Sequence, residues 1–360
     1  MNARLVLRGC ALAVPLALLP ALAASAAEPG KKYDLKNAEV QRVTDGGLEW
    51  LAKNQSRMGH WAAQNRYPTA MTALAGTALL GGGSTTTQGK YKKNVTKAVD
   101  YLLSRRRSNG LIGDPTRDDR YTYGHGFAML FLSQVLGEEE DAERREELIK
   151  TLAMAAKFSG QSQTPAGGWG YVSAKDGGGF DEGSTTITQV QGLRGCRNAA
   201  VPVPKEIIDK AIVYIHKCTT ADGGVQYNSH GGGGRPAISA AAIACLYNAG
   251  EYDGDYVGRV LGYCQKNLDN ISNQGFGHWH YAHYYYSQVV YRQGGETWEK
   301  YRDKVFPRII SEAKFSKEME GGKEKELAYW DQGYIGVVYT TAMNLTILQL
   351  EKGALPIYQR

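Results

Sequence analysis

Apolar residues recur along most of the chain with the spacing of an amphipathic helix. Positions i, i+3 and i+4 are apolar at Leu48, Leu51 and Ala52, and similar stretches follow at regular intervals. Each stretch ends at a glycine-rich turn, after which a second stretch is apolar around more of its circumference and rich in Ala, Gly and Thr, as expected for a helix packed on both sides. The second stretches cover residues 69–80, 121–136, 184–196, 236–249, 281–293 and 334–350. We therefore expect pairs of helices in which the second helix is the more deeply buried.

These pairs recur at nearly constant length. The aromatic or apolar residue that closes each glycine turn is found at Trp61, Ile112, Trp169, Val225, Trp279 and Trp330, in steps of 51, 57, 56, 54 and 51 residues. A helical hairpin cannot bury its apolar face alone, so consecutive hairpins must stack, and six of them can close into a ring. An open solenoid would end in a polar capping repeat, whereas the last inner stretch is as apolar as the others. The sequence therefore predicts an all-α protein, an (α/α)6 toroid of six hairpins over residues 40–351, with the second helices inside.

The N-terminal residues are typical of an export signal. Arg4 and Arg8 precede an apolar stretch over residues 11–22, and residues 24–26 form a small-residue cleavage site. About 12 apolar residues interrupted by two prolines are too short to span a bilayer, and the later apolar runs contain polar residues. We expect a signal peptide over 1–27, a linker over 28–39, a C-terminal tail over 352–360, no transmembrane segment, and a periplasmic or extracellular protein.

Composition, charge and cysteine content set further limits. The 360 residues are 42% hydrophobic, enough for a large core. Loss of the two signal arginines takes the formal charge from +6 to +4, which is too mild to indicate nucleic acid as a partner. The later cysteines lack metal-type spacing, and we expect small buried core residues, although export leaves disulfides open. They are Cys196, Cys218, Cys245 and Cys264.

The glycine turns carry a recurring motif. The first contains Trp50, Leu51, Gln55, Gly59 and Trp61; the third contains Ala155, Phe158, Gln163, Gly167 and Trp169; the fourth is a weakened copy with Ala211, Tyr214, Ile215, Gly223 and Val225. This pattern is similar to the QW repeat of squalene and oxidosqualene cyclases. Together with the C-terminal part, it resembles an exported bacterial branch of the prenyltransferase/squalene oxidase repeat family. The resemblance covers about residues 40–350 and implies the terpenoid cyclase/protein prenyltransferase toroid. In this motif we expect the glutamine to satisfy backbone groups at a helix end while the tryptophan covers the turn.

The catalytic motifs implied by this resemblance are missing. Squalene-hopene cyclases protonate an alkene with an aspartic acid of a DxDD-type motif. The nearest acidic cluster here, Asp114, Asp118 and Asp119, has a different spacing, and we expect it to cap the second inner helix. Protein prenyltransferases hold Zn²⁺ through Asp, Cys and His, but the corresponding positions here include Ala241 and Ile243. We therefore expect no metal and no cofactor, and whether the protein is an enzyme stays open.

All six inner helices should run in the same direction, so that their N-terminal ends meet at one mouth. The unpaired N–H groups there carry a partial positive charge, which favours an anion. Polar and aromatic residues near these N-termini are the predicted ligand-binding residues. They are Tyr121, Tyr123, His125, Arg235, Tyr334 and Tyr339.

The segment HWHYAHYYY at 278–286 is the densest chemical signal in the chain. His280 and His283 share one face of a helix, and Tyr284 lies four residues after His280. Histidine titrates near neutrality and tyrosine can donate or accept a proton, so we predict these three residues as catalytic. The alternative is that they pack the ring, because the sequence offers no evident carboxylate partner.

Three functions follow from these observations. The first is an exported terpenoid cyclase/prenyltransferase-like toroid that binds an apolar or amphipathic, isoprenoid-like ligand in a central cavity. The second is a non-catalytic binding or scaffold protein, and the third is a toroid of the polysaccharide lyase type that uses His, Tyr and Arg. A deep apolar cavity with aromatic walls would favour the first and a filled centre the second. An open polar groove with Arg235 near His280 and Tyr284 would favour the third. The oligomeric state stays open.

Overall fold

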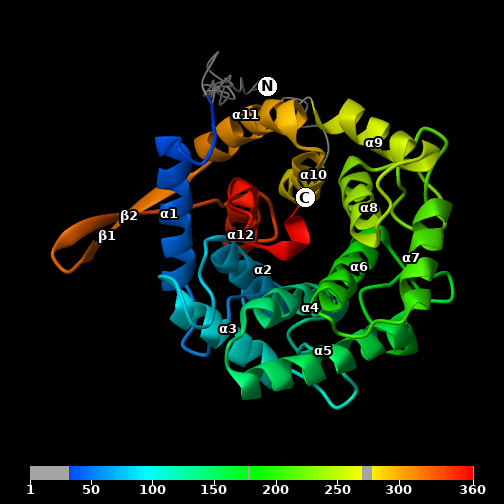
Figure 1. Ribbon diagram of the computed structural model, residues 1–360, viewed down its shortest axis with the longest axis horizontal. Coiled ribbons are helices and arrows are strands. Elements are labelled where there is room, and N and C mark those ends of the chain that lie inside the picture. Colours follow the sequence, from blue (N-terminus) through cyan, green and yellow to red (C-terminus); the bar gives the residue numbers. More distant parts are fainter. Residues whose placement is uncertain (1–31, 177–178, 270–277, 360) are drawn as a thin grey trace, which may run out of the picture.

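The computed structural model describes residues 32–176, 179–269 and 278–359, so the expected signal peptide lies outside the described residues. Its α-helices form two concentric rings and alternate between outer and inner positions along the chain (Figure 1). The outer ring consists of α1 (Ala38–Lys53), α3 (Lys92–Ser104), α5 (Ala142–Ser162), α7 (Lys205–Lys217), α9 (Asp255–Leu268) and α11 (Gly295–Ser311). The inner ring consists of α2 (Pro68–Gly81), α4 (Tyr121–Glu138), α6 (Gly183–Asn198), α8 (Pro236–Ala249), α10 (Trp279–Gln293) and α12 (Val337–Leu348). The predicted all-α toroid of six hairpins is confirmed.

The inner ring is closed. Each inner helix packs against the next along the chain, and α12 packs against α2. Small residues allow close contact: a Cβ on Gly126 of α4 would lie 2.7 Å from the carbonyl oxygen of Thr188 in α6. Every residue of α2 is buried, which agrees with its apolar sequence. Within the described residues no helix is long and apolar enough to cross a membrane.

The glycine turns, which lie between the two helices of a hairpin, pack against the outer helix of the next hairpin. Gly167 has φ +99°, and a Cβ there would lie 2.3 Å from the backbone oxygen of Lys210 in α7. Only glycine fits this contact, because the left-handed backbone and the close carbonyl both exclude a side chain. The same positive φ and the same kind of contact recur at Gly59, Gly110 and Gly223. These turns therefore set the spacing between consecutive outer helices.

The glutamine and tryptophan of the motif form hydrogen bonds to backbone groups at the turns, as expected. The Gln163 amide donates to the carbonyl oxygens of Gly167 (2.8 Å) and Ile207 (2.9 Å), and Gln55 makes the equivalent pair of bonds. The buried indole N–H of Trp169 donates to the Ser159 oxygen at 2.8 Å. Whether these turns are the QW repeat of the squalene cyclases stays a prediction.

Each described turn residue also holds its inner helix. Its backbone N–H donates to a side chain in the first turns of that helix: Trp61 to Thr72, Ile112 to His125, Trp169 to Thr186, Val225 to Ser239 and Trp330 to Thr341. Trp279 does not fit this series, because it is the first residue of α10. Its alignment with the turn residues was wrong, and the turn before α10 lies outside the described residues.

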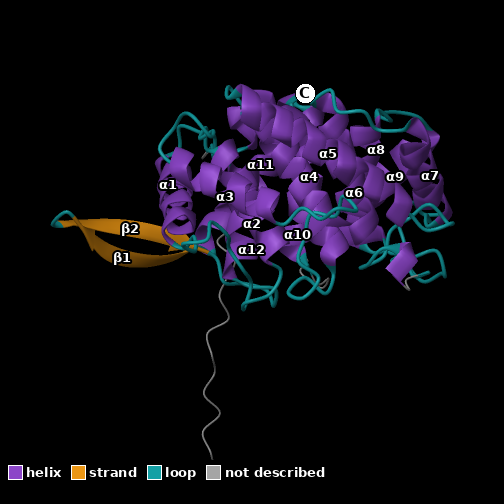
Figure 2. Cartoon of the chain, turned by 90° about the horizontal axis from the view of Figure 1, so that it is seen from below, coloured by secondary structure: helices purple, strands orange, loops and turns teal. Residues whose placement is uncertain are grey.

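A β-hairpin interrupts the last repeat and was not expected. Strand β1 (Lys314–Glu320) pairs antiparallel with β2 (Lys323–Tyr329), and the hairpin projects beyond α1 (Figures 1 and 2). Its turn is Gly321-Gly322, both at positive φ. Two glycines between strand-like runs were a readable hairpin signal. Strand β2 is fixed to α1, where the Lys325 ammonium lies 2.7 Å from the Glu49 carboxylate.

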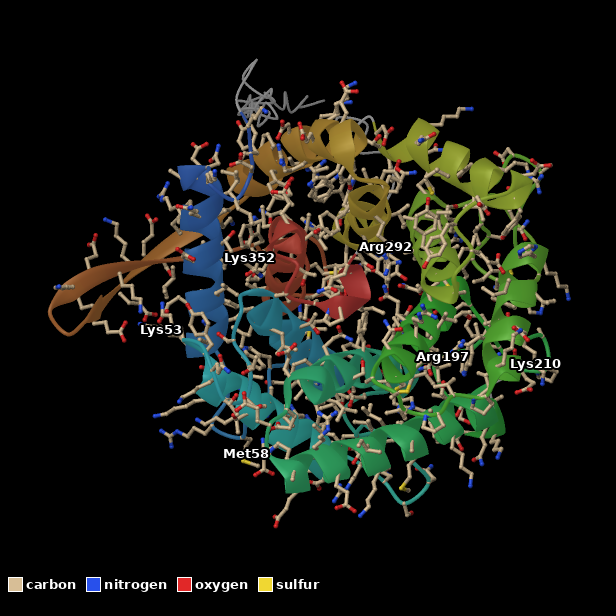
Figure 3. The ribbon with its side chains drawn as sticks, viewed as in Figure 1. Lys53, Met58, Arg197, Lys210, Arg292 and Lys352 are labelled. Carbon is tan, nitrogen blue, oxygen red and sulfur yellow. The ribbon has the colours of Figure 1, made fainter. Side chains whose placement is uncertain are left out.

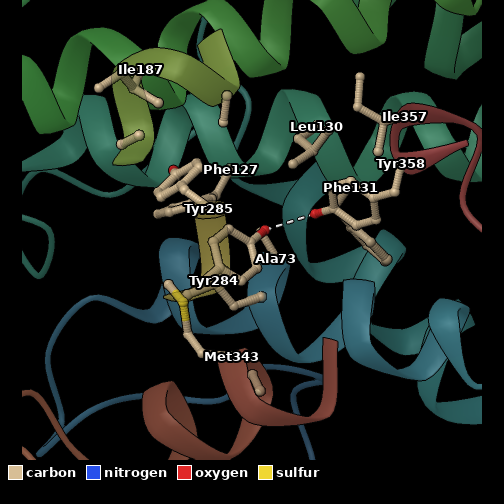
Figure 4. Packing of buried hydrophobic residues seen from close by; sticks show 14 of the residues in the cluster. Ala73, Phe127, Leu130, Phe131, Ile187, Tyr284, Tyr285, Met343, Ile357 and Tyr358 are labelled. Atoms are coloured by element: carbon tan, nitrogen blue, oxygen red, sulfur yellow. Dashed lines mark hydrogen bonds between the residues drawn. The ribbon is translucent and has the colours of Figure 1, made fainter. Parts of the chain in front are cut away.

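The C-terminal segment closes one end of the ring. Two short 3-10 helices, η2 (Leu350–Lys352) and η3 (Pro356–Tyr358), carry the chain back into the centre, where Ile357 and Tyr358 are buried (Figures 1 and 4). Arg292, near the end of α10, points toward this segment and donates to the Ile357 carbonyl (Figure 3). Residues 352–359, which we expected as a tail, therefore belong to the toroid and fill its centre at the C-terminal ends of the inner helices.

The four cysteines of the described chain are free and buried, as expected for core residues. Burial raises the pKa of the Cys196 thiol to about 12 and that of Cys218 to about 11. They are therefore packing groups, with little thiolate at neutral pH.

Candidate functional site

The N-terminal ends of the inner helices meet at the opposite end of the ring. Backbone bonds join the segments that precede them: Tyr67 N–H to Arg117 O, Thr122 N–H to Tyr171 O, and Gly183 N–H to Tyr227 O. Four aromatic side chains, three of them half-buried and Phe180 exposed, form a contact cluster on one side of this mouth. We call Tyr123, Tyr171, Phe180 and Tyr227 the aromatic rim.

A buried acid lies beneath the aromatic rim. Glu182 precedes α6, and its carboxylate accepts hydrogen bonds from the backbone N–H groups of Ser184 (2.9 Å) and Thr185 (2.6 Å). It also accepts one from the Tyr123 hydroxyl at 3.0 Å. Burial raises the pKa of Glu182, and the bonds from Ser184 oppose that rise. Sequence reasoning missed this residue. Its position just before the Ser- and Thr-rich start of an inner helix was the available signal.

Two arginines stack on the aromatic rim. The Arg120 guanidinium lies 4.2 Å from the centre of the Tyr171 ring, and that of Arg235 lies 4.7 Å from the centre of the Tyr227 ring. The hydroxyls of Tyr171 and Tyr227 hydrogen-bond to each other. The mouth therefore combines aromatic surface, positive charge at the solvent side and the buried carboxyl group of Glu182.

Tyrosines line the ring below this carboxyl group. The Tyr281 hydroxyl donates to the Ser184 carbonyl oxygen at 3.4 Å, and its ring packs edge-on against Tyr285 at 4.8 Å. Tyr285 is fully buried beside Phe127 (Figure 4). Among the described residues its hydroxyl makes no hydrogen bond of good geometry, although the neighbouring Tyr281 hydroxyl lies close enough to oppose the rise in pKa that burial causes. Burial raises the pKa of Tyr285, so this hydroxyl keeps its proton.

The predicted catalytic residues do not meet at one point. The His280 ring bonds the Asn344 side chain (3.0 Å), the His283 ring bonds the Tyr301 hydroxyl (2.7 Å), and the Tyr284 hydroxyl bonds that of Tyr358 (2.8 Å). Burial lowers the pKa of His280 to about 4 and that of His283 to about 3, and raises the pKa of Tyr284 to about 12. All three are therefore neutral near pH 7, and their catalytic role stays a prediction.

His280 does have a carboxylate neighbour that the sequence did not reveal. Its Nε2 lies 4.0 Å from Oε2 of Glu312, at the end of α11. The two residues are 32 positions apart in the chain, so only the packing of α10 against α11 brings them together.

The predicted ligand-binding residues divide into two groups. Tyr123, Arg235 and the half-buried Tyr339 lie on inner-helix N-termini near the mouth, and the 74% exposed Tyr334 lies outside it beside His278. The side chains of Tyr121 and His125 instead form hydrogen bonds within the wall of the ring. The Tyr121 hydroxyl accepts from the Ser173 N–H and contacts Asp176.

His125 has both ring nitrogens occupied. Nδ1 accepts from the Ile112 N–H at 3.1 Å, and Nε2 donates to the Ala155 carbonyl oxygen at 3.1 Å. Burial lowers the pKa of His125 to about 4. This geometry makes His125 a structural residue of the second hairpin, and we leave it out of the site.

The acidic cluster does not cap the second inner helix, so that expectation was wrong. Arg120 occupies the cap position of α4 without a side-chain bond. Asp118 instead accepts from the Thr69 hydroxyl (2.6 Å) near the start of α2, because the loop before α4 folds back over the preceding hairpin. In the described ranges no three His, Cys, Asp or Glu side chains are grouped to hold a metal ion.

Comparison with known proteins adds support for the fold. No protein-family model and no curated protein sequence matches this chain. Two solved structures of the type II terpene cyclase MstE from Scytonema share its architecture, each with a TM-score of 0.54. One, in complex with the substrate geranylgeranyl dihydroxybenzoate, is 14% identical and aligns over 88% of this chain and 98% of its own. The other, with the product merosterolic acid A, is 15% identical over 89% and 98%. The chain is therefore a terpenoid cyclase-like α/α toroid in fold.

Proposed function

We propose that this exported toroid binds an amphipathic, isoprenoid-like ligand that enters at the mouth, with its apolar part inside the ring and its polar end near the aromatic rim. The buried hydroxyl of Tyr285, which makes no well-formed hydrogen bond among the described residues, carries this proposal. Buried polar groups are nearly always hydrogen-bonded, and an unpaired one costs about 1–3 kcal/mol. A hydroxyl or carbonyl group of a ligand would pair with it.

The surroundings of Tyr285 support an apolar ligand body. Phe127 of the inner helix α4 lies beside Tyr285 and is only 5% exposed (Figure 4). Apolar and aromatic walls with a few placed polar groups are typical of small-molecule sites. The similar toroid of MstE holds a geranylgeranyl chain joined to a polar ring, which is the same ligand class.

The lyase-type function has less support. A lyase-type site requires Arg235 near His280 and Tyr284, but Arg235 stacks on Tyr227 while His280 bonds Asn344. The C-terminal segment fills one end of the ring, which favours a binding protein without catalysis, and our proposal accordingly names a ligand class and no reaction. We propose binding without assigning a reaction, because the nearest acid, Glu182, is used to hold the start of α6.

Substitution of Tyr285 tests the proposal, with geranylgeraniol as the probe. Tyr285→Phe removes only the unpaired hydroxyl. We expect unchanged or higher thermal stability and an affinity for geranylgeraniol about 5- to 100-fold lower, which corresponds to one lost hydrogen bond of about 1–3 kcal/mol. Titration calorimetry in detergent below its micelle concentration measures the affinity, and native mass spectrometry confirms one bound molecule.

Tyr91→Phe is the matched control. Its hydroxyl bonds the Glu49 carboxylate at 3.1 Å between α1 and α3, away from the mouth. This variant should lose about 1 kcal/mol of stability and bind geranylgeraniol like wild type. Absence of geranylgeraniol binding to the wild-type protein, or equal affinity in Tyr285→Phe, would contradict the proposal.

A further inference from the structure

Polar atoms without a protein partner gather in the ring wall between α10, α11 and α12, apart from the mouth. They are Nε1 of Trp279, Oε2 of Glu312 and Nδ2 of Asn344, all buried. Native proteins leave few such atoms unpaired, and a group of them commonly marks bound water or a ligand. Three in one wall therefore indicate something bound there.

His280 lies at the centre of this group. Its Nδ1 is 3.0 Å from Oδ1 of Asn344, and its Nε2 is 4.0 Å from Oε2 of Glu312. The second distance is too long for a direct hydrogen bond and suits one intervening water. The Trp279 ring packs edge-on against His280 at 5.0 Å.

The hydrogen-bonding capacities match those of water. Because Asn344 presents its oxygen to Nδ1, that nitrogen carries the proton of a neutral imidazole, and Nε2 is left as an acceptor. The wall then offers two acceptors, His280 Nε2 and Glu312 Oε2, on one side of the imidazole, and an unpaired donor, Nε1 of Trp279. The unpaired Nδ2 of Asn344 lies at the opposite, Nδ1 edge of the ring, so it requires a second water. A water molecule has two donors and two acceptor sites, and buried waters usually make about three hydrogen bonds.

Charge argues against an ion in this place. The Glu312 carboxylate would repel an anion. The Arg308 guanidinium, which donates to Glu312 Oε1 at 2.8 Å and lies 4.1 Å from the centre of the Trp279 ring, would repel a cation. His283, the other titratable group in this wall, bonds Tyr301.

We propose that the wall between α10, α11 and α12 is a buried water site in which one water bridges His280 Nε2 to Glu312 Oε2, with Trp279 Nε1 and Asn344 Nδ2 as further donors to water in this wall. Glu312 is then the positioning carboxylate of His280. The pair forms a second polar site that does not depend on the ligand at the mouth. Burial keeps His280 neutral near pH 7, so Nε2 retains the lone pair that the water needs.

Water contact at the Trp279 indole tests the site in the wild-type protein. With ¹⁵N-labelled tryptophan, we expect a cross-peak between the Trp279 indole proton and long-lived water. Trp61, Trp169 and Trp330 serve as internal controls, because their buried indoles donate to the carbonyls of Leu51, Ser159 and Ile309. The control indoles should show no such cross-peak. Absence of the signal at Trp279, or equal signals at all four, overturns the proposal.

A charge-removing variant tests the link to Glu312. Glu312→Gln should change the ¹⁵N shift of His280 Nε2 near pH 7, where the imidazole is neutral, because an amide replaces the carboxyl group to which the water bridges. Tyr301→Phe is the comparison: it disturbs the neighbouring His283 and should leave the His280 shift in place. An unchanged His280 Nε2 shift in a folded Glu312→Gln protein would show that the two groups are not joined, whereas the water signal of the wild-type protein can be read even if this variant does not fold.

Discussion

The hydroxyl of Tyr284, on the inner helix α10, lies 2.8 Å from that of Tyr358, in the C-terminal 3-10 helix η3 (Figure 4). This bond joins the C-terminal segment to the centre of the ring. The N–H of the neighbouring Ile357 donates to the Gln134 side chain at 3.1 Å, and its side chain is 1% exposed. The segment is therefore part of the core.

Shortening Ile357 should weaken the whole fold. Ile357→Ala removes a buried branched side chain, and we expect a loss of about 2–5 kcal/mol in the free energy of unfolding. Urea unfolding followed by circular dichroism measures it. Val213→Ala, at a 65% exposed position on α7, is the control and should change stability by no more than about 0.5 kcal/mol. Equal effects of the two substitutions would mean that the C-terminal segment is not packed in the ring.

The turn glycines should not tolerate a side chain. Gly167→Ala places a Cβ 2.3 Å from the Lys210 oxygen at φ +99°. Left-handed strain of about 1–2 kcal/mol and overpacking of about 1–3 kcal/mol together predict a loss of about 3 kcal/mol. Gly262→Ala, on the exposed face of α9 with open space around it, should instead stabilise the protein by about 0.5–1 kcal/mol. The melting temperatures of the two variants should move in opposite directions.

Acid should destabilise the fold through its buried histidines. In the folded protein the pKa is lowered to about 4 for His125 and His280 and to about 3 for His283, whereas the unfolded chain binds these protons near pH 6.5. The unfolded state therefore binds more protons between these values. Stability is complete above pH 6.5 and falls as the pH is lowered toward 4, by up to about 1.4 kcal/mol per pH unit for each histidine.

His283→Gln checks this dependence. Urea unfolding at several pH values from 7 to 4.5 should give a shallower slope for the variant than for wild type, by about one proton. The comparison uses slopes, so a constant loss of stability in the variant does not affect it. Parallel curves would show that His283 is protonated equally in the folded and unfolded chains.

The buried thiols should resist modification. Burial raises the pKa of Cys196 to about 12, and the thiolate is the reactive form. Under native conditions at pH 8 we expect little alkylation by iodoacetamide at Cys196, Cys218, Cys245 or Cys264, and complete alkylation in 6 M guanidinium. Peptide mapping by mass spectrometry reads each site separately. Rapid native labelling, or peptides joined by a disulfide, would contradict the packing.

The sequence by itself determined the helices, their pairing into six hairpins and the closed ring. Those features depend on patterns that can be read along the chain, namely helical periodicity and glycine turns such as the one at Gly167. The hydrogen bond of Gln163 to Ile207 adds a contact between neighbouring outer helices and depends on the same repeat. The burial of the cysteines followed from their apolar surroundings for the same reason.

Only the tertiary structure decided which way the inner side chains point. The helix α10 is buried around most of its circumference and carries three consecutive tyrosines, so adjacent Tyr284 and Tyr285 read alike in the sequence. In the ring the Tyr284 hydroxyl pairs with that of Tyr358, whereas the Tyr285 hydroxyl makes no well-formed hydrogen bond among the described residues. Glu312 reaches His280, and Glu182 reaches Tyr123, across separate hairpins. These contacts form only when the hairpins pack side by side in the ring. The arrangement of the hairpins, and not the local sequence pattern, decides which side chains meet.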